Sequence, residues 1–328
     1  MKIGIIGAGG VGAACLLAGV LRGSAREFVL LDRTAKRARA VAEDVAYGAP
    51  VGAPVRVGHG DYPDFAGCDL VMITAGINEK AGGATDRSDP EGRLRLIDAN
   101  AAVFRDIVPR VVGVAPEAVL LVVTDPPDPL ADLARDLAPQ SPVVSTGTWL
   151  DSMRLRTHVA RRLRVDPASV EALVLGEHGT SEVFVWSGVT IGGVPLPQVL
   201  RARGEDAGGF REAIEKEVRY ANIAIIEGNN ASQYGIGMVC ARIAEAVLGD
   251  ERIVVPVGAY RAEHGVTLSL PSVLGARGVE DGLSLALAEA EQALLDKSIA
   301  ALRTARERAL APAHRPAATR SAGVRPVC

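Results

Sequence analysis

The chain has 328 residues, of which 48% are hydrophobic and 23% charged, and its net charge is −3. This composition is typical of a folded protein with a large aliphatic core, and at ~150 residues per domain it indicates two domains. The small negative charge gives no reason to expect nucleic acid or an anionic membrane as a partner. No run reaches the ~18 apolar residues of a membrane span. The cysteines, at 15, 68, 240 and 328, form no metal-type spacing, so we expect no metal site and a reduced, cytoplasmic protein.

The first half alternates short apolar runs with helical patterns. We expect strands at 2–6, 28–31, 69–74, 118–124 and 142–145, and helices at 11–21, 34–46 and 94–112. Strands that alternate with helices predict βαβ units and a parallel sheet. The fold class is therefore α/β, with a Rossmann-type domain at 1–145.

The second half has a different pattern. We expect helices at 151–163, at 210–248 with an interruption near 228–237, and at 281–308. Strands are expected at 172–175, 183–186, 253–257 and 265–271. This mixture predicts an α+β catalytic domain at 146–310. The tail at 311–328 is rich in Pro, Ala and Arg, and we expect it to be disordered.

A glycine-rich motif follows the first strand and opens the first helix. It consists of Gly7, Ala8, Gly9, Gly10, Val11 and Gly12. The first glycine permits a tight turn, the second lets the backbone approach a pyrophosphate, and the last lets helix and strand pack closely. The pattern alone is a weak signal, but its position between a strand and a helix predicts a dinucleotide site.

Asp32 ends the second strand, about twenty residues after that motif. A carboxylate there accepts hydrogen bonds from ribose hydroxyls and repels a 2′-phosphate. The predicted cofactor is therefore NAD, although Arg33 and Arg37 leave NADP open.

A histidine and a carboxylate–arginine pair carry the predicted chemistry. His178 lies in a polar, glycine-flanked loop, and Asp151 and Arg154 are three residues apart, on one face of a helix. A carboxylate beside a histidine fixes its tautomer and stabilises the imidazolium. An arginine beside them can hold a substrate carboxylate in a bidentate contact. The alternative is a simple helix start, with Asp151 as its cap and an ion pair to Arg154.

Several motifs in order resemble the L-lactate/malate dehydrogenase family from residue 1 to about residue 310. They are GAGGVG, ITAG, LDSMRLR, LGEHG, SQYGIGM and LSLPSVLGARGV. The Thr-Ser that follows GEHG is closer to the lactate branch than to the commonest malate branch. The resemblance implies an oxidoreductase that transfers a hydride between NAD and C2 of a small 2-hydroxy or 2-keto acid. It also implies a homodimer or homotetramer.

The resemblance assigns roles to individual residues. His178 exchanges the hydroxyl proton, Asp151 orients it, and Arg154 anchors the substrate carboxylate. Arg93, on a mobile loop, polarises the C2 oxygen, with Arg87 as an alternative. The position of Ser232 implies that it lines the pocket for the substrate side chain. Further implied cofactor contacts are Val11, Gly76, Ile77, Val123, Asp125 and Thr146.

Three departures from the family concern the substrate. The loop from Gly76 to Arg93 is longer than usual. Alignment from Ala75 and Gly76 places Glu79 where lactate enzymes have Gln and malate enzymes have Arg. A negative charge there argues against a dicarboxylate and suits a neutral polar or cationic side chain, unless the insertion moves Glu79 into solvent. Asp125 stands where the family has an Asn that contacts both ribose and substrate. It either becomes protonated in a closed site or indicates a different substrate.

Three functional hypotheses follow. The first is a lactate dehydrogenase-like enzyme with an unusual substrate side chain, and the second is a malate dehydrogenase. The third, from another class, is an inactive NAD-binding sensor or scaffold.

In bacterial relatives that fructose bisphosphate activates, an arginine pairs with a histidine. Here Arg156 matches the arginine and Glu171 replaces the histidine, which predicts no such activation.

Overall fold

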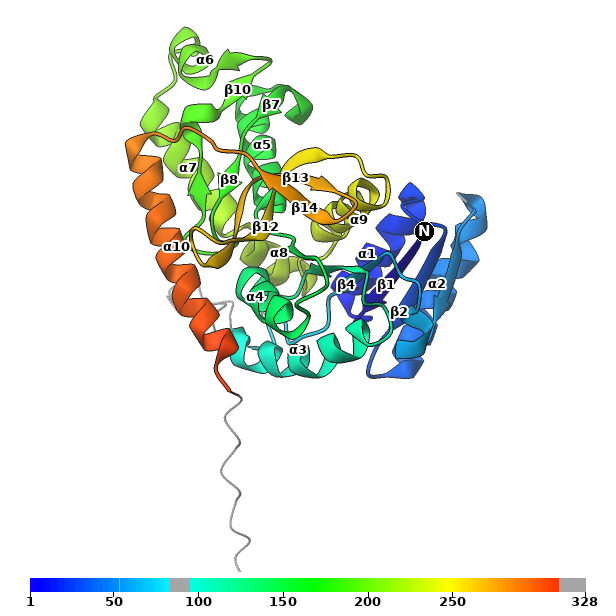
Figure 1. Ribbon diagram of the computed structural model, residues 1–328. Helices are drawn as coiled ribbons and strands as arrows, with labels where there is room; N and C mark the ends of the chain where they lie inside the picture. Colours follow the sequence, from blue (N-terminus) through cyan, green and yellow to red (C-terminus); the bar gives the residue numbers. More distant parts are fainter. Residues whose placement is uncertain (53, 79, 83–94, 313–328) are drawn as a thin grey trace, which may run out of the picture.

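The computed structural model describes residues 1–52, 54–78, 80–82 and 95–312 (Figure 1). A nine-stranded sheet runs through it in the order β14-β13-β12-β6-β5-β4-β1-β2-β3. The six strands from β6 to β3 are all parallel. They are β1 (Lys2–Ile6), β2 (Glu27–Leu31), β3 (Arg56–His59), β4 (Leu70–Ile73), β5 (Val119–Val122) and β6 (Val143–Ser145).

Helices cover both faces of this parallel part. One apolar core lies between the sheet and the helices α1, α2 and α9, and a second lies between the opposite face and α3 and α4. Burial on both faces explains why β4 and β5 consist entirely of apolar residues. The helices are α1 (Gly10–Arg22), α2 (Ala35–Gly48), α3 (Ile97–Val112), α4 (Pro127–Leu137) and α9 (Tyr234–Leu248).

Three antiparallel strands from the second half extend the same sheet. They are β12 (Ile253–Arg261), β13 (Val266–Gly275) and β14 (Gly278–Gly282). The junction is the pairing of β12 with β6, where Gly258 lies opposite Ser145. The two halves of the chain are therefore joined by a continuous hydrogen-bonded sheet.

The rest of the second half forms a helical layer with two small sheets. A separate apolar core lies among α5, α6 and α7. The helices are α5 (Trp149–Leu163), α6 (Leu196–Arg203), α7 (Ala207–Arg219), α8 (Ala221–Asn229) and α10 (Glu289–Leu310). The short strands are β7 (Val170–Glu171), β8 (Val174–Leu175), β9 (Val183–Phe184), β10 (Thr190–Ile191) and β11 (Val194–Pro195).

The mixed α/β architecture confirms the predicted fold class, but some elements differ from the prediction. The expected helix at 281–308 begins only at Glu289, because Gly278–Gly282 pairs with β13 as a strand. Helix α4 was not predicted. It begins at Pro127, a position where the backbone N–H of a helix has no intrahelical partner and proline is therefore tolerated. The strand β3 and the helix α6 were also missed.

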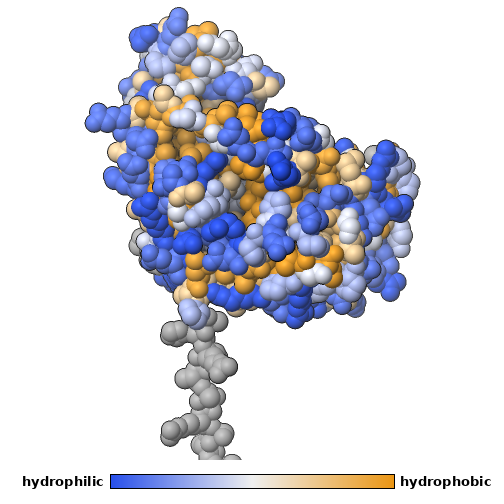
Figure 2. Space-filling view, in the orientation of Figure 1, coloured by the Kyte–Doolittle hydropathy of each residue, from blue (hydrophilic) through white to orange (hydrophobic). Residues whose placement is uncertain are grey.

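On the face that Figure 2 shows, apolar side chains gather in several patches among polar ones. Among the described residues, no helix is long and apolar enough to cross a membrane. The expectation of a disordered tail concerns mainly residues 313–328, which lie outside the described part of the chain.

Candidate active site

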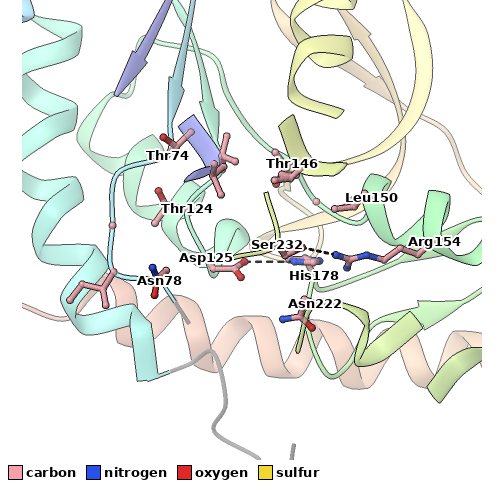
Figure 3. Close-up of a pocket in the computed structure, with 16 residues that line it drawn as sticks. Thr74, Asn78, Thr124, Asp125, Thr146, Leu150, Arg154, His178, Asn222 and Ser232 are labelled. Carbon is pink, nitrogen blue, oxygen red and sulfur yellow. Dashed lines mark hydrogen bonds and ion pairs between the residues drawn. The ribbon is translucent and has the colours of Figure 1, made fainter. Parts of the chain in front are cut away.

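A pocket lies at the carboxyl ends of β4, β5 and β6, between the parallel sheet and the second half of the chain (Figure 3). Ligands bind at such ends in open α/β sheets. The pocket brings together most of the residues predicted to contact cofactor and substrate. Its lining consists of Val11, Thr74, Gly76, Ile77, Asn78, Val123, Thr124, Asp125, Thr146, Gly147, Leu150, Arg154, His178, Asn222, Ser232 and Ile236.

His178 and Asp151 form a close pair in this pocket. The Nδ1 atom of His178 lies 2.5 Å from Oδ2 of Asp151, which is 1% exposed. Asp151 is in the first turn of α5, where the helix dipole favours a negative charge. The contact fixes the orientation of the imidazole ring.

Arg154 contacts the carboxylate oxygen of Asp151 that His178 does not. Its guanidinium donates to Oδ1 at 2.7 Å, and its second terminal nitrogen lies 3.4 Å from the hydroxyl of Ser232. The predicted i,i+3 arrangement is therefore observed, and it places a cation beside the imidazole. A planar carboxylate could bind to the guanidinium while its neighbouring carbon faces His178.

Asp125 approaches the opposite side of the imidazole. Its Oδ1 atom lies 3.7 Å from Nε2 of His178 (Figure 3). Its backbone carbonyl accepts a hydrogen bond from Nδ2 of Asn100. The same side chain donates from Nδ2 to the carbonyl of Ile77 and accepts at Oδ1 from the N–H of Ile77. This buried asparagine, which was not predicted as a site residue, ties the two segments that form the pocket wall.

Asp128 is a second residue that sequence reasoning missed. It is 1% exposed, and its Oδ2 atom accepts a hydrogen bond from the backbone N–H of His178 at 3.1 Å. Its Oδ1 atom accepts from the hydroxyl of Ser145 at 2.5 Å. Burial raises the pKa of Asp128 to about 7. Asp128 is the second residue of α4, and the sequence was interpreted there only as a departure from the family, with no local signal of its contact with His178.

Glu182 is buried near the pair of His178 and Asp151. Burial and the nearby charge of Asp151 raise its pKa to about 8. Its Oε1 atom makes no hydrogen bond within the described part of the chain. The raised pKa favours the neutral carboxyl, which reduces the negative charge near His178.

The glycine-rich loop fits the pyrophosphate of a dinucleotide. Gly7 has a φ of +105°, and a Cβ on Gly12 would lie 1.8 Å from the carbonyl oxygen of Gly7. Gly9 faces open space, and α1 begins after it without a side-chain cap, so its first N–H groups can bind an anion. The side chain of Gln233 covers Gly10, because a Cβ atom on Gly10 would lie 2.0 Å from Oε1 of Gln233.

Asp32 lies at the end of β2 beside this loop. Its two oxygens accept hydrogen bonds from the backbone N–H groups of Ala8 and Thr34, each at 2.8 Å. These bonds hold the carboxylate in place and use one lone pair on each oxygen. The remaining lone pairs suit the two hydroxyls of a ribose.

Two predicted substrate residues, Glu79 and Arg93, lie outside the described residues, as does the alternative Arg87. Their roles stay predictions. Arg156 and Glu171, which stand where activated bacterial relatives bind fructose bisphosphate, lie within the described residues. The guanidinium of Arg156 donates a hydrogen bond to Oε2 of Glu171 at 2.9 Å.

Comparisons with known proteins agree on one family. The family model for the NAD binding domain of lactate/malate dehydrogenases matches residues 1–144, and the model for the α/β C-terminal domain of that family matches 148–312. An L-lactate dehydrogenase of Deinococcus radiodurans is 45% identical, with 92% of this chain and 97% of that protein covered. One of Thermus aquaticus is 44% identical, with 93% and 98% covered.

Solved structures give the same result. A lactate dehydrogenase from a Medee basin deep-sea metagenome library superposes with a TM-score of 0.86 at 32% identity, over 94% of this chain and 98% of that one. A minor L-lactate dehydrogenase of Enterococcus mundtii also has a TM-score of 0.86 at 32% identity, over 93% and 97%. The order of the motifs, the pocket and these matches lead to one conclusion: the chain belongs to the lactate/malate dehydrogenase family and lies on its lactate branch.

Proposed function

We propose that this protein is an NAD-dependent dehydrogenase that interconverts a small 2-hydroxy acid and its 2-keto acid. The observation that carries the proposal is the contact of His178 with Asp151, beside Arg154 and in a pocket that adjoins the dinucleotide loop. In this proposal, residues 1–145 bind NAD and residues 146–310 carry the catalytic groups.

Each catalytic residue has a separate task. Arg154 binds the substrate carboxylate, which places C2 next to Nε2 of His178. In the oxidation direction, Nε2 accepts the hydroxyl proton while the C2 hydrogen leaves as a hydride. When bound, NAD supplies the hydride acceptor. In the reverse direction the imidazolium returns the proton to the C2 oxygen.

Asp151 supports both protonation states of His178 that this transfer requires. Its buried carboxylate stabilises the charged imidazolium through the 2.5 Å contact and holds the neutral ring in the tautomer whose Nε2 atom accepts the proton. Ser232 sits beside the guanidinium of Arg154, where it limits the space for the substrate side chain.

We also propose a homo-oligomer that works in the cytoplasm. Large apolar side chains are exposed on α1 and α9, which pack against each other: Leu17, Leu21, Tyr234 and Met238. Such a patch supports an interface with a second copy. Cys15, Cys68 and Cys240 are buried and free, which supports a reducing compartment.

The test is NADH oxidation, followed by absorbance, with pyruvate, 2-oxobutyrate, oxaloacetate, and branched, aromatic and amino-bearing 2-keto acids. We expect turnover with a monocarboxylate and its loss, by about 10²–10⁴-fold, in His178→Asn. A clear preference for oxaloacetate would support the malate dehydrogenase alternative. Tight NADH binding without turnover of any member would contradict the proposal and support a sensor or scaffold.

A further inference from the structure

Asn222 is a buried polar residue of the pocket to which no role has been assigned. It is the second residue of α8, is 5% exposed and lines the pocket together with His178 (Figure 3). Within the described part of the chain its amide makes no hydrogen bond. Its side chain lines the pocket, so the amide is available to bind a polar group of a ligand that enters there.

The two substrate anchors determine which part of a substrate reaches Asn222. Arg154 takes the carboxylate, and His178 takes the oxygen on C2. The substituent on C2, which begins with C3, must then face the remaining wall, to which Asn222 and Ser232 both belong. Since the hydroxyl of Ser232 lies 3.4 Å from the guanidinium of Arg154, it is directed toward the carboxylate anchor. Asn222 remains as the polar group for C3.

The other amide of the pocket is already engaged. Asn78 lines the same space, but its Oδ1 atom accepts a hydrogen bond from the backbone N–H of Ala81 at 2.9 Å. This bond fixes Asn78 within its own turn. Of the two amides among the described lining residues, Asn222 is thus the one whose oxygen and nitrogen are both open to the substrate.

The charge of the pocket restricts the polar group on C3. Among the described lining residues, Arg154 is the one lysine or arginine, and the carboxylate on C1 uses it. Asp125 adds a carboxylate 3.7 Å from Nε2 of His178. A second substrate carboxylate would meet no described cation, whereas a hydroxyl is neutral and can both donate to and accept from the amide.

We infer that Asn222 is a specificity-determining residue that selects 2-keto acids with a neutral hydroxyl group on C3. This inference rests on the proposed function. The reaction is the reduction of a 3-hydroxy-2-keto acid: a hydride from NADH adds to C2, the C2 carbonyl π bond breaks, and the oxygen takes the proton of the His178 imidazolium. The products are a 2,3-dihydroxy acid and NAD.

The experiment compares two substrates of nearly equal size, hydroxypyruvate and 2-oxobutyrate, which differ by a hydroxyl in place of a methyl group. We expect the wild type to favour hydroxypyruvate at least about tenfold in kcat/KM, because an alkyl group leaves the amide unpaired. Asn222→Leu has a side chain of the same branched shape but no amide. The ratio of the two kcat/KM values should fall by about 5- to 150-fold, which corresponds to about 1–3 kcal/mol for one polar group left without a partner.

Two further variants separate specificity from folding. Asn222→Ala removes the same amide with a strong helix former, and its ratio must fall in the same direction. Asn229→Leu makes the same substitution at the exposed end of the same helix, where Nδ2 bonds the carbonyl of Ala231. Its substrate ratio should equal that of the wild type. NADH affinity and the melting temperature are measured for each variant.

The outcomes distinguish this inference from the proposed function. If the wild type reduces pyruvate and 2-oxobutyrate but does not favour hydroxypyruvate, the role of Asn222 is refuted and the dehydrogenase activity stands. An unchanged ratio in both Asn222 variants also refutes it. If no keto acid is reduced, both proposals fail together.

Discussion

Asp128 joins the loop that carries His178 to the end of strand β6. One carboxylate oxygen accepts from the backbone N–H of His178 at 3.1 Å, and the other accepts from the hydroxyl of Ser145 at 2.5 Å. Two acidic side chains therefore position His178, Asp151 through its ring and Asp128 through its backbone.

Asp128→Asn tests the electrostatic cost of this arrangement. Burial raises the native pKa of Asp128 from 3.8 to about 7. A raised native pKa means that the stability contributed by the protonated carboxyl is fully present below the unfolded pKa and is lost as the pH rises through the native pKa. The amide preserves both contacts, with Oδ1 accepting from His178 and Nδ2 donating to Ser145, but it does not titrate.

We therefore expect the melting temperature of Asp128→Asn, relative to wild type, to rise between pH 5 and about pH 8. Asp128→Ala, which leaves the N–H of His178 without its acceptor, should lose about 1–3 kcal/mol of stability. Thermal unfolding at several pH values measures both effects. Parallel curves for wild type and Asp128→Asn would show that the carboxyl does not titrate in this range.

Arg154→Lys tests the substrate anchor. A lysine keeps the charge but cannot make the planar bidentate contact with a carboxylate. We expect kcat/KM for pyruvate to fall by about 100-fold, mainly through KM. Arg156→Lys on the same helix is the matched control, because Arg156 bonds Ala172 and Glu171 instead. Equal losses in the two variants would contradict the assignment.

Asp151→Asn tests the orientation of the histidine. The amide can keep Oδ1 toward Arg154, but Nδ2 then donates to Nδ1 of His178 and places the ring proton on Nε2, which is the wrong tautomer for accepting a proton. We expect kcat for hydroxy-acid oxidation to fall by about 10²–10⁴-fold. NADH affinity, followed by fluorescence, should change little. A kcat within a few-fold of wild type would mean that the tautomer is set elsewhere.

Asp125→Asn tests the carboxylate near Nε2 of His178. Removing this negative charge should lower KM for anionic keto acids by about tenfold, since unit charges a few ångströms apart interact by more than 1 kcal/mol near a protein surface. A steady-state panel of pyruvate, 2-oxobutyrate and oxaloacetate measures the effect. If activity and preference both stay unchanged, Asp125 has no role in choosing the substrate.

The pair of Arg156 and Glu171 predicts the absence of one form of regulation. Glu171 lies 2.9 Å from the guanidinium and competes with any phosphate for it. Fructose bisphosphate should therefore leave KM for pyruvate unchanged. Glu171→Gln, which removes the competing charge, is the variant in which a response could appear. A drop in KM of the wild type on addition of the bisphosphate would refute this prediction.

The sequence predicted best what depends on short spacing. The i,i+3 geometry placed Asp151 beside Arg154, and the strand–turn–helix context identified the loop at Gly7. Asp128 and Asn222 were missed because their partners are distant in sequence: Asp128 meets His178 across 50 residues. Nothing in the local pattern of a proline-rich helix start or an apolar helix reveals which pocket the side chain enters. Chain packing alone brings them to the site.

The pairing of β6 with β12 has a consequence for dissecting this protein. A fragment that ends near residue 145 would lose β12 and expose β6 as a bare edge of the sheet. Exposed edges with apolar residues recruit other chains, so the isolated fragment should aggregate rather than bind NAD as a monomer. Fragments intended for binding studies therefore need β12 and β13, although these strands follow the cofactor-binding half by more than a hundred residues.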